Sequence, residues 1–246
     1  MAAVAPYDPV DKAREVARIV CDGALRKYHR FRPARFYGGI ATADCVGCCL
    51  GCIFCWAWEQ VVRPEAHGRF YSPEEVAQRL VGIARKHGFL QMRISGNEPT
   101  IGRSHLLEVA GLVPEDIRFV LETNGILIGH DPSFAEDLAR FPNLHVRVSL
   151  KGATEDEFAR LTGARPEAFE LQLQALANLD RAGASVHVAV MTSFSPPESV
   201  EKLRARLARI APRFAEFEDE ELVLYGHVTE RLKRAGITYR SARRPG

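Results

Sequence analysis

The amino-terminal part of the chain carries one apolar stripe at helical spacing. Apolar residues recur every three or four positions within residues 9–28, namely Val10, Ala13, Val16, Ala17, Val20 and Ala24. This spacing places them on one face of an α-helix, which would bury that face against the rest of the protein. We therefore predict a leading amphipathic helix within an amino-terminal helical extension, residues 1–35.

From residue 36 onward, short apolar runs alternate with longer amphipathic segments. The clearest helix start is Ser72-Pro73-Glu74-Glu75, which combines an N-cap serine, a proline at the first helical position and a glutamate three residues past the cap. We predict strands just before the cysteines and at 89–95, 117–122, 144–150, 185–192 and 222–225. We predict helices at 72–88, 104–111, 133–140, 166–182, 198–210 and from 229 onward.

Alternation of strands and helices is typical of crossover units, which build a parallel sheet. The six predicted strands fall short of the eight in a closed barrel. We therefore predict an α/β fold, a partial (β/α)6 barrel that forms a single domain over residues 36–246. Ligands of such sheets bind beyond the carboxyl ends of the strands. The acidic run 216–221 is interpreted as a solvated loop.

Composition narrows the classes of function. The net charge of +2 and a pI of about 8.2 indicate no large basic field, although they do not exclude a nucleic-acid partner. Basic residues cluster at 26–35 and in the tail at 240–244, and such clusters are more often solvated faces than binding sites. No apolar run reaches the roughly 18 residues of a membrane helix. The amino terminus lacks the layout of a secretory signal. We expect a cytoplasmic protein with no membrane partner.

Five of the six cysteines fall between Cys45 and Cys55, which favours a metal or cluster site over a disulfide framework. A three-then-two spacing occurs twice, in Cys48, Cys52 and Cys55 and in Cys45, Cys49 and Cys52. Three close thiolates can hold three irons of a 4Fe-4S cubane and leave the fourth iron open. The alternatives are a ferredoxin-type cluster with a fourth ligand, and a structural zinc that would need more ligands at a distance.

The run from Cys48 to Cys55 resembles the signature of the radical S-adenosylmethionine (radical SAM) superfamily, in which an aromatic residue precedes the third cysteine. Phe54 supplies that aromatic residue, whereas the other register would place Gly51 there. The resemblance implies a 4Fe-4S cluster, a metal site on Cys48, Cys52 and Cys55, with Phe54 beside the adenine of S-adenosyl-L-methionine.

Cys45 and Cys49 are spare in this register. Both are expected to be small buried hydrophobic residues, and Cys45 is also a candidate for a part in reduction or catalysis.

Gly96-Asn97-Glu98-Pro99 ends the second predicted strand and resembles the superfamily's Gly-Gly-Glu-Pro motif. The resemblance implies that this segment receives the methionyl amino group of the cofactor. Gly96 would let the backbone approach closely, and Glu98 would offer a carboxylate to the ammonium. Asn97 departs from the family's second glycine. A plain Gly-Asn turn is the alternative interpretation.

Three further strand ends supply candidate cofactor contacts. Glu122 and Asn124 lie in a Leu-Glu-Thr-Asn-Gly run that is typical of the superfamily. On the fourth strand, Ser149 would contact the ribose or carboxylate of the cofactor. Lys151 would neutralise the methionyl carboxylate, take a catalytic part or point to solvent. Tyr225, on the sixth predicted strand, would lie along the adenine.

The resemblance implies an oxidoreductase that cleaves S-adenosylmethionine reductively. A flavodoxin or ferredoxin would supply the electron, and the resulting 5′-deoxyadenosyl radical would abstract a hydrogen from a substrate. Residues 149–163 resemble the glycyl-radical-enzyme activating branch, which favours a protein substrate, although Ser149 stands where that branch usually has Asp. Trp56 after the third cysteine resembles the wybutosine-synthesis enzymes that modify transfer RNA. A small metabolite is the third class. An iron–sulfur electron-transfer module is the non-enzymatic alternative, and it would leave the residue 96–99 motif unexplained.

The loop after the cysteines holds both tryptophans of the chain and several basic residues. Because it follows the cluster, we expect its aromatic and basic side chains to form the substrate end of the cavity. These residues are Trp56, Trp58, Arg63 and His67. The alternative is that the two tryptophans only pack the loop against the barrel.

Overall fold

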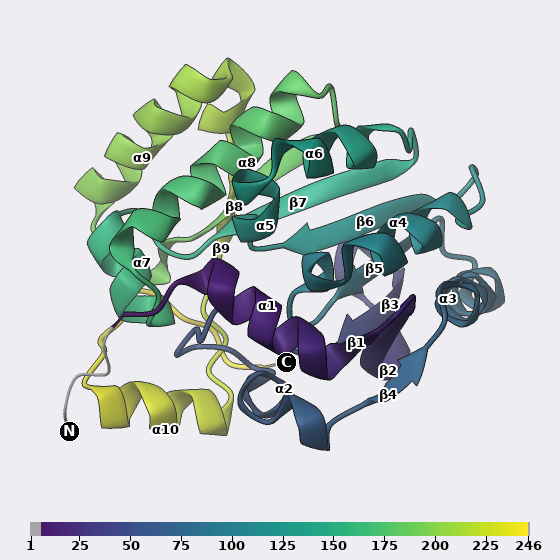
Figure 1. Ribbon diagram of the computed structural model, residues 1–246. Coiled ribbons are helices and arrows are strands. Elements are labelled where there is room, and N and C mark those ends of the chain that lie inside the picture. Colours follow the sequence, from purple (N-terminus) through teal and green to yellow (C-terminus); the bar gives the residue numbers. More distant parts are fainter. Residues whose placement is uncertain (1–5, 246) are drawn as a thin grey trace.

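The structure, a computed structural model, describes residues 6–245 (Figure 1). Six strands run parallel: β3 (Ile40–Cys45), β5 (Gln91–Ser95), β6 (Arg118–Thr123), β7 (Leu144–Leu150), β8 (Val186–Met191) and β9 (Glu218–Glu220). Three more strands pair antiparallel at one edge: β1 (Cys21–Asp22), β2 (Leu25–Ala34) and β4 (Arg69–Tyr71). The sheet order is β1-β2-β3-β5-β6-β7-β8-β9, with β4 paired to β2. The predicted α/β partial barrel is confirmed.

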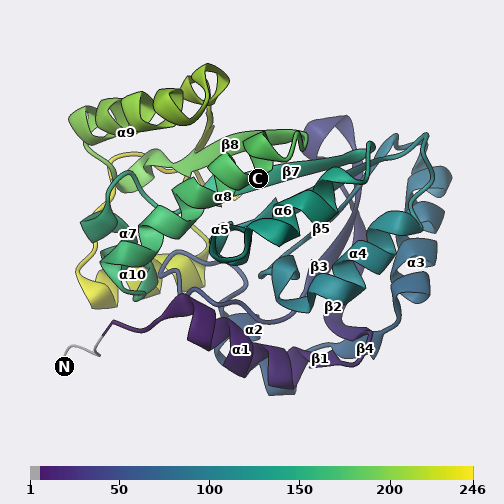
Figure 2. The same cartoon turned by 45° about the horizontal axis from the view of Figure 1, so that its top comes forward.

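Helices follow the parallel strands and cover one face of the sheet (Figure 1). They are α3 (Pro73–His87), α4 (Arg103–Gly111), α5 (Ile126–His130), α6 (Pro132–Ala139), α7 (Glu155–Thr162), α8 (Phe169–Arg181) and α9 (Pro197–Ile210). Figure 2 shows the same layers from a second direction, with α3 at one end and α9 at the other. Three helices lie outside this layer: α1 (Pro9–Val20), α2 (Trp58–Val62) and α10 (Gly226–Ala235). Among residues 6–245, no helix is long and apolar enough to cross a membrane.

The two faces of the sheet differ sharply in chemistry. On β3, the side chains of Ala41 and Ala43 enter the apolar core beneath the helices. The alternating positions Thr42 and Asp44 point to the opposite face, which we call the inner face. There Thr42 accepts a hydrogen bond from Arg93 of β5 at 3.1 Å. The same alternation places polar side chains of several strands on the inner face, next to a small apolar cluster of Ala34, Ile40 and Val120.

The capping signals at the start of α3 act as the sequence predicts. The Ser72 side chain accepts a hydrogen bond from the backbone of Glu75, and the Glu75 carboxylate accepts one from the backbone of Ser72 at 2.8 Å. The helix ends at Gly88 in the left-handed conformation, with φ of 67°. Both ends are therefore satisfied by local residues.

The predicted leading helix is too long. Helix α1 ends at Val20. Residues 21–34 then form an antiparallel hairpin of β1 and β2. Gly23, with φ of 57°, lies in the turn. The apolar stripe of the predicted helix does not continue past this turn. In β2, Tyr28 and Phe31 pack on the helix side of the sheet, whereas Arg30 and Arg32 lie on the inner face. The basic cluster at 26–35 thus lies almost entirely on strand β2. Residues 1–5 of the expected extension lie outside the described residues.

The sixth strand also lies elsewhere than predicted. The sequence places it at 222–225, but the structure places β9 within the acidic run, where Asp219 pairs with Val190 of β8. Glu218 and Glu220 both point to Arg147 of β7, which explains how acidic residues form a strand beside an apolar one. The closing helix starts at Gly226, three positions before the predicted Thr229.

Candidate functional site

The cysteine-rich loop, residues 46–57, follows β3 at the carboxyl end of the sheet. Its amino-terminal part is attached to the end of β5, because the backbone N–H of Glu98 donates to the Gly47 carbonyl at 3.0 Å. Its centre is attached to the end of α7, where Gly51 and Ile53 donate to the carbonyls of Thr162 and Leu161 at 3.1 and 2.8 Å. The segment after β5 and the end of α7 therefore hold the loop at two places.

The five cysteines between Cys45 and Cys55 differ in burial. Cys45, which ends β3, and Cys49 are 0 % exposed within the apolar core. Cys52 is buried in the same core but is 8 % exposed, and Cys48 and Cys55 are partly exposed. Cys48, Cys52 and Cys55 form the three-then-two set in which Phe54 precedes the last cysteine. This burial supports Cys48, Cys52 and Cys55 as the ligands and leaves the other two as packing residues.

The three thiols fit a positively charged inorganic group. Burial, and next the neighbouring Cys48, raise the pKa of Cys55 to about 11. Burial likewise raises the pKa of Cys52. Buried thiols ionise when a cation balances them, and cluster irons supply that charge. Within residues 6–245, no three His, Cys, Asp or Glu side chains are grouped to share a single metal ion. The thiolates of a cubane bind separate irons.

Glu98 is a buried hub that joins the ends of β5 and β6. Its side chain is 0 % exposed. One carboxylate oxygen accepts from the backbone and hydroxyl of Thr100, at 3.1 and 2.6 Å, and from the Thr123 hydroxyl at 2.7 Å. The other oxygen accepts from the backbone N–H of Asn124 at 2.8 Å. Glu98 therefore orders this strand end, and its contact with a cofactor ammonium stays a prediction.

Gly96 and Asn97 hold the strand end against the cysteine loop. Gly96 has φ of 101°, and a Cβ there would lie 2.9 Å from the Asp44 Cα. The close approach is thus to the neighbouring strand end. The Asn97 side-chain oxygen accepts from the backbone of Gly47 at 3.0 Å. This contact gives the departure from the family's second glycine a structural reason. Pro99 begins a short 3-10 turn.

Asn124 lies directly against the cysteines. Its side-chain amide is 3.3 Å from the Cys49 sulfur and 3.8 Å from the Cys48 sulfur. Gln172 of α8, 0 % exposed, donates to the carbonyls of Asn124 and Ser149 and accepts from the backbone of Lys151. The sequence analysis missed Gln172. A glutamine on the apolar stripe of a helix was the available signal.

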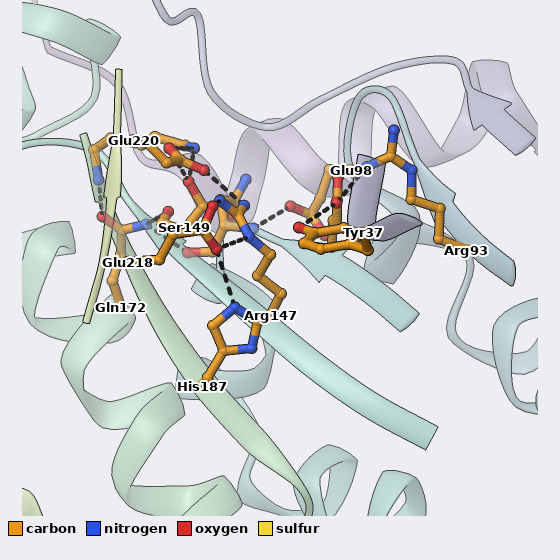
Figure 3. Close-up of polar contacts among 12 residues, drawn as sticks. Tyr37, Arg93, Glu98, Arg147, Ser149, Gln172, His187, Glu218 and Glu220 are labelled. Atoms are coloured by element: carbon orange, nitrogen blue, oxygen red, sulfur yellow. Dashed lines mark hydrogen bonds and ion pairs between the residues drawn. The ribbon is translucent and has the colours of Figure 1, made fainter. Parts of the chain in front are cut away.

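Ser149 and Lys151 belong to a charged network that crosses the inner face (Figure 3). Arg147 donates to both oxygens of Glu218, at 2.9 and 2.8 Å, and to Glu220 at 2.6 Å. Ser149 donates to Glu220 at 2.6 Å, and Lys151 donates to Ser149. Burial raises the pKa of Cys52, and the positive charge of Lys151 is the largest influence that opposes this rise. The lysine thus connects this network to the cysteine loop. Arg147 and Glu220 were not expected from the sequence.

The far end of this network contains a histidine. His187 contacts Glu218 at 3.2 Å. The hydrogen bond from His187, and then Arg147, lower the pKa of Glu218 to about 2. Glu218 is therefore an anion over the whole physiological range, and it anchors β9 to β7 and β8.

Three other predicted cofactor residues have definite surroundings. Glu122 accepts from Arg93 at 2.6 Å and from the Tyr37 hydroxyl at 3.4 Å. Phe54 packs against Phe194, with ring centroids 5.4 Å apart. Tyr225 lies at the N-cap of α10 and not on a strand, so the strand-based reason for its adenine contact was wrong.

The four predicted substrate residues are dispersed. Trp56 is 40 % exposed, and the Arg30 guanidinium lies 5.1 Å from its ring centroid. Trp58 packs beneath Arg231 of α10 at 4.8 Å. Arg63 points to solvent and pairs with Glu59 one helical turn away. His67 has a buried Nε2 atom without a hydrogen-bond partner among the described residues. Of the four, Trp56 reaches the inner-face arginines.

Comparison with known proteins agrees with the cysteine and strand-end geometry. The family model described as the Radical SAM superfamily matches residues 44–209. A GTP 3′,8-cyclase of Syntrophomonas wolfei is 29% identical over 175 residues, which cover 69% of this chain and 52% of that protein. A probable GTP 3′,8-cyclase of Thermoplasma volcanium is 30% identical over 118 residues, 47% of this chain and 33% of that protein. The chain spans about half or less of the length of these relatives.

Solved structures share the fold. The structure of anSMEcpe with bound AdoMet and Cp18Cys peptide has a TM-score of 0.56 at 18% identity, covering 74% of this chain and 50% of that one. SuiB of Streptococcus suis bound to S-adenosylmethionine has a TM-score of 0.53 at 18% identity, covering 82% and 48%. These similarities support the partial barrel and its mostly parallel sheet.

Proposed function

The chain belongs to the radical SAM superfamily, and on this premise we propose that it takes a hydrogen atom from a small, polar substrate held on the inner face of the sheet. Its cofactors are a 4Fe-4S cluster and S-adenosyl-L-methionine. When bound, they supply an electron and a 5′-deoxyadenosyl radical, which the protein must direct at one substrate hydrogen.

Residues at the carboxyl end of the sheet would hold the cofactors in place. Cys48, Cys52 and Cys55 would hold the cluster, with Asn124 beside the first of them. Phe54 and Phe194 offer an apolar surface suited to the adenine. Lys151 and Ser149, between the cysteine loop and Glu220, are suited to the carboxylate or ribose of the cofactor. Gln172 keeps the ends of β6 and β7 in place.

The observation that supports a polar substrate is the charge of the side chains on the inner face. Every parallel strand except β8 contributes an ionic side chain there, and these are Asp44, Arg93, Glu122, Arg147, Glu218 and Glu220. Fixed charges on one face of a sheet favour ligands with complementary charges and hydrogen-bonding groups. The relatives named GTP 3′,8-cyclase support a small charged substrate.

A protein substrate, as in the glycyl-radical-enzyme activating branch, is the second candidate. It is supported by the similarity of residues 149–163 to that branch and by the fold shared with SuiB bound to its precursor peptide. A flavodoxin or ferredoxin is the electron donor that we propose for either substrate.

The test measures 5′-deoxyadenosine formed by the anaerobic, dithionite-reduced protein given S-adenosylmethionine. We expect slow release without substrate, a faster rate with ribose-deuterated GTP, and deuterium in the 5′-deoxyadenosine. A serine- and cysteine-containing peptide is the comparison. Stimulation by the peptide alone would favour the second candidate. An intact cluster with no 5′-deoxyadenosine under any condition would reduce the chain to an electron carrier.

A further inference from the structure

Four of the arginines on the inner face, Arg30, Arg32, Arg93 and Arg147, differ in how completely their donors are used. Arg93 donates to Thr42 and Glu122 and lies 4.7 Å from the Phe36 ring. Arg147 uses Nε and both terminal nitrogens on two carboxylates. These two side chains are 7 % and 9 % exposed. Both are therefore structural cations that hold neighbouring strands together.

Arg30 and Arg32 of β2 are different. Each donates only through Nε, and both donate to the same oxygen of Asp44, at 3.0 Å for Arg32. No other hydrogen bond or ion pair of either guanidinium is formed with residues 6–245. The arginine side chains are 43 % and 28 % exposed, whereas Asp44 is 0 % exposed. The two guanidiniums therefore meet at one Asp44 oxygen, and their terminal nitrogens remain open to a ligand.

The charge of this cluster is not balanced locally. Two guanidiniums against the one Asp44 carboxylate leave a net positive charge on the inner face, beside Trp56. The other hydrogen-bonding neighbour of Asp44 is the Ser95 hydroxyl, at 3.4 Å, which is neutral. Adjacent guanidinium forks with free terminal N–H groups match the geometry of an oxyanion.

A further unsatisfied group lies beside Arg30. His29, directly before Arg30 at an irregularity in the β2–β3 pairing, has a buried Nε2 without a partner among the described residues. The His29 ring lies 6.5 Å from the ring of Trp56, which in turn faces Arg30. Buried polar atoms are normally satisfied, so this orphaned atom independently indicates a missing ligand.

We propose that Arg30 and Arg32 form a phosphate-binding subsite of the substrate cavity and that Trp56 stacks on the planar base of the same ligand, a nucleoside phosphate. A single carboxylate would occupy one guanidinium fork, whereas a phosphate has enough oxygens and charge for two. The exposed indole supplies the flat apolar surface that a base requires. This inference rests on the proposed function, because it names the substrate class of the same cavity.

The test is anaerobic calorimetry of the cluster-loaded protein with GTP, ATP, guanosine and inorganic triphosphate. We expect both nucleotides to bind, and Arg30→Gln and Arg32→Gln each to weaken them on the order of tenfold, the value of one charge-assisted hydrogen bond. Guanosine affinity should change little in these variants. Trp56→Leu should weaken guanosine and leave inorganic triphosphate unchanged. In each arginine variant Asp44 keeps its second arginine, so its carboxylate is not left unpaired.

The matched control is Arg85→Gln, the same charge change at an exposed arginine that pairs with Asp116 away from the inner face. Its nucleotide affinity should equal that of the wild type. Iron content reports folding of every variant. The proposal is overturned if neither nucleotide binds the wild type, if Arg85→Gln weakens binding as much as Arg30→Gln, or if S-adenosylmethionine affinity falls in place of nucleotide affinity. Wild-type release of 5′-deoxyadenosine separates these failures from a failure of the proposed function.

Discussion

At the scale of single residues, burial separates the thiols that can reach a cluster from those that cannot. Cys45 and Cys49 are 0 % exposed within the core, whereas Cys48 and Cys55 are partly exposed and Cys52 retains 8 % exposure. We expect Ala at any of the last three to remove most of the iron, because a cubane on two thiolates is poorly held. Cys45→Ala and Cys49→Ala should retain most of it, as measured by iron per chain.

The opposite pattern would contradict this assignment. Iron lost in Cys45→Ala but retained in Cys55→Ala would show that the other three-then-two register binds the cluster. The two alanine variants at buried positions are matched controls, since each removes one thiol of the same loop.

Glu98 gives a second prediction, which concerns stability. Its carboxylate accepts four hydrogen bonds from Thr100, Thr123 and Asn124 without exposure to solvent. Glu98→Gln places an amide donor against these donors, so we expect the free energy of unfolding to fall by roughly 1.5–3 kcal/mol, the value of a hydrogen bond to a charged group. Urea unfolding of the apoprotein measures it.

Glu108→Gln is the control for this change, because Glu108 is an exposed glutamate on α4. Equal stability of the two variants would mean that Glu98 is not the hub of this strand end. In that case the carboxylate would be free for the cofactor ammonium, as the sequence motif alone suggests.

The local motifs of the site are visible in the sequence, and their partners are not. The cysteine spacing and the Gly-Asn-Glu-Pro run are contiguous, so they identify the family and the strand end. Gln172 and Arg147 contact residues 21 to 73 positions away, and nothing in the adjacent sequence marks either of them. Such contacts depend on which strands are adjacent, which sequence periodicity does not specify.

At the scale of elements, the inner face explains both errors in the predicted strands. In strand β2, aromatic residues pack on the helix side of the sheet, whereas Arg30 and Arg32 lie on the inner face. The sequence of β2 therefore shows no simple apolar pattern. Strand β9 consists of acidic residues whose charges are neutralised by Arg147. Apolar alternation detects strands with one buried apolar face, and these two strands carry paired charges on the inner face instead.

The β9 contact makes stability depend on pH. Hydrogen bonding from His187 and the charge of Arg147 lower the pKa of Glu218 from 4.5 to about 2 in the folded protein. A depressed folded pKa contributes stability above pH 4.5, and this contribution is lost as the pH falls from 4.5 toward 2. We expect Glu218→Gln to be less stable than the wild type at neutral pH, with a difference that shrinks through this window.

Urea unfolding of both proteins in steps from neutral pH downward measures this difference. Comparing the variant with the wild type cancels other titrating groups, including His145, whose pKa burial lowers to about 4. A difference that stays constant across the window would show that the ion pairs of Glu218 contribute nothing to the attachment of β9.

At the scale of the whole molecule, the two ends of the chain converge on the cysteine loop. From the amino-terminal side, the Tyr7 hydroxyl accepts from the backbone of Gly51 at 2.8 Å. From the carboxyl-terminal side, His227 of α10 contacts the Trp56 carbonyl at 3.0 Å. The final segment is tied down in turn, because Arg240 donates through its backbone to Ser193 at 2.7 Å. The cluster loop is therefore held by elements that the radical SAM match over residues 44–209 does not include.

Arg231 of α10 makes the strongest of these contacts and gives the last prediction. Its guanidinium donates to the carbonyls of Ile53, at 3.1 Å, and Cys55, and it covers the Trp58 ring. Arg231→Met keeps the length of the side chain but removes both donors, each worth roughly 1.5–3 kcal/mol. If loop opening precedes iron loss, this energy corresponds to at least about a tenfold faster release of iron to a chelator. Arg234→Met is the matched control, since Arg234 lies one turn along α10, is 79% exposed and pairs only with Glu230 among residues 6–245. Equal rates of iron release from the two variants would show that α10 does not restrain the cluster loop.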